Sequence, residues 1–338
     1  MNHYENCMQC PKKCGVNRTQ KQKGFCQETD DLKIAFAGLH FGEEPLVTVF
    51  GGSGTIFITG CTLRCAFCQN YQISQNGYGS NVDSKEFTKM CLDLQNAGAE
   101  NINIVTGSHH IPKLAEFIRA AKDAGVTIPF CWNSSAYETV ESLELLKGLV
   151  TIWLPDLKTL SSSLSKDLFL APDYPQVAEK AIKWMIQNNP LKIKTVESPK
   201  NAKSIEWAQD GEPREKMEQG VIIRHLFLPG KFQETADVLQ WLKENADTKS
   251  CISLMNQYTP VSFDEEKTKL ERRQKALKAI ENRLVSQEED LDIQDLIEAY
   301  DFEYLFYQEL SDDTSWLPDF TKPQPFSNAL ATPIWHCK

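Results

Sequence analysis

The sequence predicts an α/β protein built on a partial (β/α)6 barrel of the TIM type. Two observations support this fold class: short apolar runs recur six times along the chain, and amphipathic helical patterns separate them. Runs of this length are typical of buried strands, and strands that alternate with helices form parallel β/α units. Six units are too few for the eight-stranded closure of a full barrel. An open, doubly wound sheet is the alternative arrangement.

The predicted strands share a length of five to eight residues. They lie at residues 55–59, 101–106, 127–131, 149–154, 221–228 and 251–255. Between them, residues 84–97 and 111–124 each place apolar side chains on one helical face and end at Gly98 and Gly125, respectively. The remaining helical patterns lie at residues 138–147, 174–188 and 232–245.

Two segments flank the predicted barrel, which we place at residues 51–260. Residues 1–50 are rich in cysteine, glycine and lysine, so we expect a loop-dominated cap with one strand at 32–41. Residues 261–338 are expected to form a helical and irregular extension that covers the barrel. In it, one long charged helix carries an apolar stripe formed by Leu270, Leu277, Ile280 and Leu284. The polar residues 195–219 are expected to form a surface excursion.

The composition argues against several classes of partner. The chain of 338 residues has 36 basic and 46 acidic side chains, a net charge of −10, so it lacks a general basic surface for nucleic acid. Its longest apolar stretches, about six residues, are far shorter than the roughly 18–20 that span a bilayer. We therefore expect a soluble, cytoplasmic protein with no membrane partner. Twelve carboxylates between Arg283 and Lys322 form either a solvated acidic face or a docking site for a basic partner.

Seven of the eleven cysteines fall within the first 68 residues, and this clustering favours a metal site over a disulfide framework. Cys61, Cys65 and Cys68 follow the first predicted strand with the spacing Cys-x3-Cys-x2-Cys. Three thiolates on one loop can hold three corners of an iron–sulfur cluster. The fourth iron is then free to bind a ligand.

This spacing resembles the signature of the radical S-adenosylmethionine superfamily, in which an aromatic residue, here Phe67, precedes the last cysteine. The run from Phe57 to Ser74 resembles the branch similar to pyruvate formate-lyase activating enzymes. Within that branch, the chain resembles a subgroup that also has an N-terminal cysteine cluster.

The resemblance implies a cytoplasmic enzyme whose three cysteines bind a [4Fe-4S] cluster that chelates S-adenosylmethionine. Reductive cleavage of this cofactor would give a 5′-deoxyadenosyl radical that abstracts a hydrogen atom from the substrate. The resemblance also implies a reductant such as flavodoxin or ferredoxin. By analogy with the branch, the substrate would be a protein or peptide, as for the activators of glycyl radical enzymes.

Polar residues that end the later predicted strands are expected to face the cofactor. Residues 106–108 (Thr-Gly-Ser) stand where relatives often carry Gly-Gly-Glu. Residues 156–158 match an Asp-Leu-Lys of activating enzymes, and residue 224 begins a matching Arg-x4-Pro-Gly. Small polar groups after the third strand suit ribose hydroxyls, although they are equally typical of turns. The candidates are Thr106, Gly107, Asn133, Ser135, Asp156, Lys158 and Arg224.

Two other groups of residues leave alternatives open. His109 and His110 could serve the substrate, but exposed helix-capping residues are the favoured interpretation. A second set of cysteines supplies enough thiolates for a closed tetrahedral site, which would hold structural zinc or an auxiliary iron–sulfur cluster unless the thiols are free. Its members are Cys7, Cys10, Cys14 and Cys26. The alternative function is a non-catalytic metal-binding or electron-transfer scaffold.

Overall fold

The computed structural model describes residues 3–198, 212–314, 316–327 and 329–337. The strands are β1 (Lys33–His40), β2 (Ser53–Ile58), β3 (Ser80–Asn81), β4 (Ile102–Val105), β5 (Phe130–Ser134), β6 (Ile152–Pro155), β7 (Lys192–Val196), β8 (Arg214–Leu226), β9 (Cys251–Met255), β10 (Leu305–Gln308) and β11 (Ala331–His336). The α-helices are α1 (Tyr71–Ser74), α2 (Ser84–Asn96), α3 (Ile111–Asp123), α4 (Val140–Leu143), α5 (Ser162–Phe169), α6 (Tyr174–Asn188), α7 (Phe232–Asn245), α8 (Lys267–Leu277) and α9 (Gln287–Tyr300). Short 3-10 turns lie at Arg18–Gln20 and Glu144–Leu146.

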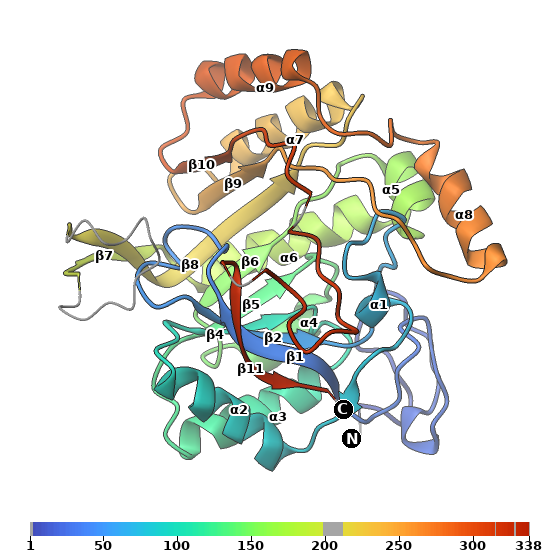
Figure 1. Ribbon diagram of the computed structural model, residues 1–338, viewed down its shortest axis with the longest axis vertical. Helices are drawn as coiled ribbons and strands as arrows, with labels where there is room; N and C mark the ends of the chain where they lie inside the picture. Colours follow the sequence, from blue (N-terminus) through green and yellow to red (C-terminus); the bar gives the residue numbers. More distant parts are fainter. Residues whose placement is uncertain (1–2, 199–211, 315, 328, 338) are drawn as a thin grey trace.

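One sheet with the strand order β10-β9-β8-β6-β5-β4-β2-β1-β11 organises the molecule (Figure 1). The neighbours from β2 to β10 pair in parallel, whereas β1 pairs antiparallel with both β2 and β11. The six predicted strands are the parallel ones from β2 to β9, and the described residues do not close the sheet into a full barrel. The predicted α/β class with a partial barrel is therefore confirmed.

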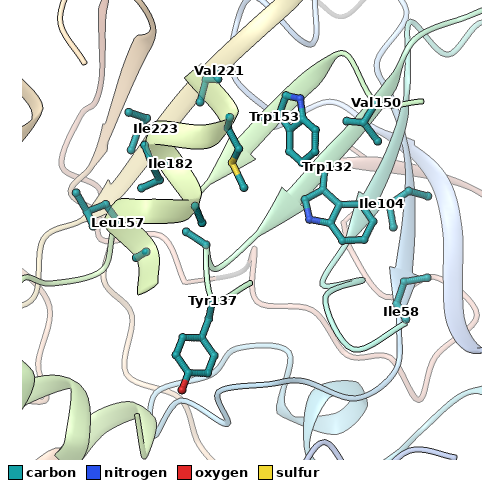
Figure 2. Close-up of a cluster of buried hydrophobic side chains, with 14 of the residues drawn as sticks. Ile58, Ile104, Trp132, Tyr137, Val150, Trp153, Leu157, Ile182, Val221 and Ile223 are labelled. Carbon is teal, nitrogen blue, oxygen red and sulfur yellow. The ribbon is translucent and has the colours of Figure 1, made fainter. Parts of the chain in front are cut away.

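The outer face of the sheet carries the largest hydrophobic core. Because successive strand residues point to opposite faces, Trp132 and Trp153 face the helices while Cys131 and Ile152 face inward. Figure 2 shows the two indoles beside aliphatic side chains of neighbouring strands. The Trp153 ring meets Trp184 of α6 edge-on, with ring centroids 5.6 Å apart. This packing fixes the strands and, with them, the loops at their carboxyl ends.

The inner face is filled in part by the connection between β1 and β2, which we name the inner loop (residues 41–52). Leu46 and Val47 of this loop are buried in a cluster that includes Ile152, Ile222 and Cys251. Its backbone is bound as well, since the Leu46 carbonyl accepts a hydrogen bond from the amide of Met217 at 3.0 Å. Part of the segment that the sequence assigned to a cap thus lies inside the barrel.

The C-terminal segment differs from the single long helix that its apolar stripe predicted. The structure forms two helices, α8 and α9, and residues 278–286 separate them. The second helix begins with a capping box: the Ser286 side chain accepts a hydrogen bond from the Glu289 amide, and the Glu289 side chain accepts one from the Ser286 amide. This pattern starts a new helix at residue 287. The last strand, β11, returns to pair with β1.

Three local features complete the comparison with the sequence. The helix predicted at 138–147 is reduced to α4 and a 3-10 turn, while α5, which the sequence analysis did not predict, is capped by Ser161. The predicted excursion at 195–219 includes an antiparallel pairing of β7 with β8, and its residues 199–211 lie outside the described part. Nowhere in the described ranges does a helix have the length and apolarity needed to cross a membrane.

The outer core should respond strongly to truncation of Trp153, which is fully buried. The substitution Trp153→Ala leaves a cavity and is expected to lower the free energy of unfolding by about 3–5 kcal/mol. The matched control is Leu291→Ala on α9, where the side chain is 61% exposed and a change within about 0.5 kcal/mol is expected. Denaturant titration measures both, and equal losses would contradict this account of the core.

Candidate active site

Three free cysteines lie on the loop that follows β2, at the carboxyl end of the parallel strands. Cys61, Cys65 and Cys68 are each partly buried. Burial raises the pKa of the Cys65 thiol; Lys158 opposes this effect, and the other two cysteines add to it. The Leu63 amide lies 3.4 Å from the Cys61 sulfur, and the Ser74 hydroxyl lies 3.2 Å from the Cys68 sulfur. The three thiols therefore lie close together with polar groups directed at their sulfurs.

An arginine from α8, far away in the sequence, holds this cysteine loop. The guanidinium of Arg273 donates to the carbonyls of Cys65 and Ala66 at 3.2 and 3.1 Å, and it forms an ion pair with Glu265. Both charged side chains are almost fully buried. The sequence analysis missed this contact because 208 residues separate Arg273 from Cys65.

A cluster of four buried polar side chains, which we name the charge cluster, lies near the carboxyl ends of β5, β6 and β8. It consists of Asn133, Asp156, Lys158 and Arg224. The Arg224 guanidinium donates to the Asp156 carboxylate at 2.9 Å and to the Asn133 side-chain oxygen at 2.6 Å. Lys158 donates to the other Asp156 oxygen at 2.7 Å. The structure thus brings together four of the seven cofactor residues that the sequence predicted.

The charges in this cluster stabilise one another. Burial alone would raise the pKa of Asp156, but Arg224 and Lys158 outweigh it and hold the pKa below its usual value. Burial alone would lower the pKa of Lys158, but Asp156 and Cys65 outweigh it and raise the pKa above its usual value. Lys158 therefore stays cationic within electrostatic reach of the cysteine thiols.

Two further carboxylates, Glu43 and Glu44 of the inner loop, approach the same guanidinium. Their oxygens lie 3.8 and 3.9 Å from Arg224 nitrogens. Burial raises the pKa of both, and Arg224 opposes it. The sequence analysis did not select these residues, although a signal existed: they are the only Asp, Glu, Lys or Arg residues between Lys33 and Arg64.

The other predicted cofactor residues lie at neighbouring strand ends. Thr106 has a left-handed backbone with φ of 62°, and its amide donates to the Asn133 carbonyl at 2.9 Å. A Cβ atom at Gly107 would lie 2.6 Å from the Trp132 ring, so close packing requires glycine there. Ser135 follows β5 and is half-buried.

The two histidines are fully buried, so the expectation that they are exposed is wrong, although His110 does occupy the N-cap position of α3. His109 lies with Nε2 2.7 Å from the Thr59 carbonyl, and His110 lies 3.0 Å from the guanidinium of Arg18. Burial, followed by Arg18, lowers the pKa of His109 to about 3, which keeps the ring neutral. The N-terminal segment covers this pair, through Arg18 and Tyr4. Burial by a segment distant in sequence has no local signal.

The second set of cysteines also converges. Burial raises the pKa of Cys10 to about 12, with further contributions from Cys26, Cys7 and Cys14. The Phe25 amide donates to the Cys14 sulfur at 3.3 Å, and the Arg18 guanidinium lies 3.9 Å from the Cys7 sulfur.

This second set abuts the first, because a Cβ atom at Gly60 would lie 3.3 Å from the Cys26 carbonyl. Among the described residues, no three His, Cys, Asp or Glu side chains are arranged to hold a single metal ion. Zinc draws its sulfur ligands to about 2.3 Å from one centre. The corners of an iron–sulfur cluster are separate iron atoms, so its thiolates lie further apart.

A cavity of about 580 Å³ opens beside the cysteine loop. Its walls come from the loop after Cys68, the segment after β9 and the C-terminal tail. They are formed by Gln69, Tyr71, Gln72, Thr259, Pro260, Val261, Ser262, Leu284, Thr314, Leu317, Pro318 and Asp319. Gln72 holds the tail in place, since its side chain bonds both the Asp319 carboxylate and the Phe320 amide.

Residues 55–194, which include the cysteine loop and the end of β6, match the family model of the Radical SAM superfamily. This part of the chain, less than half of its 338 residues, is therefore similar to radical SAM domains. The match implies a [4Fe-4S] cluster and S-adenosylmethionine, and it confirms the expectation of a radical SAM enzyme. The three free thiols on one loop fit such a cluster, because they offer soft ligands for three of its irons.

Comparison with individual proteins adds the following likenesses. An uncharacterized protein of Methanocaldococcus jannaschii, MJ0674, is 29% identical over 267 residues, which cover 77% of this chain and 68% of the relative. The structure of Streptococcus suis SuiB bound to its precursor peptide SuiA aligns with a TM-score of 0.49 and 13% identity, over 75% of this chain and 47% of SuiB. A domain of a pyruvate-formate lyase-activating enzyme from Bacteroides vulgatus aligns with a TM-score of 0.35 and 10% identity, over 59% of this chain and 92% of that domain.

The alignment with SuiB spans about half of that protein's length. With TM-scores below 0.5, neither structural likeness supports the assignment, which rests on the family match.

The cysteine loop should depend on Arg273. The substitution Arg273→Ala leaves Glu265 as an unpaired buried charge and removes the donors to the loop carbonyls, so we expect a loss of about 3–5 kcal/mol in stability. Iron bound per chain after reconstitution should fall with it. The exposed neighbour Arg272→Ala is the control and should retain both stability and iron. Normal iron loading in the Arg273 variant would contradict the role of this contact.

Proposed function

We propose that Cys61, Cys65 and Cys68 hold the [4Fe-4S] cluster and that the charge cluster faces S-adenosylmethionine. The observation that supports this most directly is the convergence of three free thiols on one loop, with Lys158 in electrostatic reach of Cys65. Three thiolates leave one iron without a protein ligand. When bound and reduced, the cluster supplies the electron that cleaves the carbon–sulfur bond of S-adenosylmethionine.

The residues of this chain contribute charge balance and exclusion of water. Lys158 offsets part of the negative charge that thiolates bring into a buried loop. Asp156 orients Lys158 and Arg224 through direct ion pairs. Phe67 packs edge-on against Phe169 and Tyr258, with centroids 5.9 and 5.7 Å away, and this aromatic group limits the access of water to the cysteine loop.

The cavity beside the cysteine loop supports a protein or peptide substrate. Among the lining residues that the structure describes, Asp319 is the only charged one, and the remaining walls mix neutral polar and apolar side chains. Such a lining suits a peptide segment, which offers amide groups and side chains rather than a fixed charge. We propose that the enzyme removes a hydrogen atom from such a segment, as the resemblance to activating enzymes implies. Flavodoxin or ferredoxin would supply the electron.

Formation of 5′-deoxyadenosine tests this function. Anaerobically purified protein, reconstituted with iron and sulfide, reduced and given S-adenosylmethionine, is expected to form 5′-deoxyadenosine. The substitution Cys65→Ala should reduce formation to background because it removes one proposed cluster ligand. The control Cys91→Ala changes a buried core cysteine on α2 and should retain the activity. Bound zinc without an iron–sulfur chromophore, together with no product, would instead support the scaffold alternative.

The N-terminal set, Cys7, Cys10, Cys14 and Cys26, is proposed to hold a second metal centre, either zinc or an auxiliary iron–sulfur cluster. The mutual proximity of its thiols and the hydrogen bond to the Cys14 sulfur support this proposal. A centre at this position would also fasten the N-terminal segment over His109 and His110, where Arg18 already binds.

Loss of one ligand should remove this centre alone. Cys10→Ala is expected to lower the metal content and the melting temperature while the spectrum of the first cluster survives. Elemental analysis of the wild type distinguishes zinc from iron. An unchanged total metal content in the Cys10 variant would show that the four thiols hold no metal.

A further inference from the structure

The inner loop carries two carboxylates that are buried in the barrel interior. The side chains of Glu43 and Glu44 are only 9% and 8% exposed, and Arg224 is the cation that both approach. That guanidinium already has closer partners. Two of its nitrogens bind the Asp156 carboxylate, and one of these two nitrogens also binds the Asn133 side-chain oxygen. The two glutamates therefore share a cation whose strongest contacts lie elsewhere.

The buried charges at this position do not balance. Three carboxylates, those of Glu43, Glu44 and Asp156, face two cations, Lys158 and Arg224. Burial raises the pKa of both glutamates, which means that the surroundings oppose their charge. An uncompensated buried charge is costly to a folded protein. Such a cost is typical of a site that a ligand completes.

An unpartnered polar atom at the same place points to a ligand. Within the described residues, one carboxylate oxygen of Glu44 is buried and has no hydrogen-bond partner. The polar neighbour of Glu43 on β4 is Asn103, which is fully buried and hydrogen-bonds that glutamate. Buried polar groups in native proteins nearly always have partners, so the Glu44 oxygen requires an explanation.

We propose that Glu43 and Glu44 are specificity-determining residues that make the barrel interior select a ligand with net positive charge. The inference rests on the proposed function, because it concerns the binding of S-adenosylmethionine. This cofactor carries an ammonium, a carboxylate and a sulfonium, hence one net positive charge. Its demethylated thioether, S-adenosylhomocysteine, has no net charge. One surplus carboxylate in the interior favours the first compound over the second.

The effect acts through the electric field and through the position of Arg224, and it requires no direct contact with the sulfonium. Two unit charges about 8 Å apart at an effective dielectric constant of about 20 interact strongly enough to change affinity by tenfold or more. Residues 43 and 44 precede the family match, which begins at residue 55. The selectivity is thus supplied by a segment outside the matched domain.

The test compares affinities for the two nucleosides. Wild type, Glu43→Gln, Glu44→Gln and the double variant are reconstituted anaerobically, and the dissociation constants for S-adenosylmethionine and S-adenosylhomocysteine are measured by equilibrium dialysis. The double variant should reduce the preference for S-adenosylmethionine by about tenfold or more, mainly through weaker binding of that compound. Iron content should not change. The control Glu116→Gln, exposed on α3, should preserve the wild-type ratio.

Thermal unfolding separates this role from a structural one. Since one substitution balances the buried charges, Glu44→Gln should melt at or above the temperature of the wild type. A lower melting temperature together with lower iron content would overturn the proposal in favour of a structural carboxylate. An unchanged affinity ratio in a fully loaded double variant would also overturn it while leaving the proposed function intact. A loaded wild type that neither binds nor cleaves S-adenosylmethionine would overturn the proposed function itself.

Discussion

The ion pair between Asp156 and Arg224 is the interaction on which the rest of the site depends. Asp156 directly follows β6, and Arg224 lies in the adjacent parallel strand β8. A backbone β-bridge also joins the two residues. The regular pairing of β6 with β8 is limited to Ile152–Gly220 and Trp153–Val221. The ion pair joins the two strands beyond the end of that ladder. Asp156 orients Lys158 toward the cysteine loop, and Arg224 reaches Asn133 on β5 and the glutamates of the inner loop. Loss of either partner would leave several buried charges uncompensated at once.

Much of this arrangement follows from local sequence patterns, for clear physical reasons. A buried strand must be apolar on both faces, and consecutive strand ends in a parallel sheet meet at one edge. The apolar runs therefore located the strands, and the cysteine spacing after the first run located the cysteine loop. For the same reason, Asn133, Asp156 and Arg224 were predicted to share one site, and they do.

The residues that the sequence analysis missed are those whose role comes from long-range contacts. Arg273 supports the cysteine loop from α8, and Glu43 and Glu44 enter the barrel from a segment expected to form a cap. The histidine pair is buried because Arg18 and Tyr4 fold over it. The sequence marks Glu43 and Glu44 only as isolated charges in an apolar stretch, and no periodicity or spacing predicts the contacts themselves, since each depends on how distant segments pack.

The pairing of β11 with β1 has a consequence for how the chain is synthesised. Strand β1 is translated well before its neighbour β11, because 290 residues (41–330) lie between the two strands. Until β11 has been synthesised, the edge of β1 that it covers stays unpaired and invites aggregation with other nascent chains. Deletion of β11 (Ala331–His336) would leave that edge exposed in the folded protein.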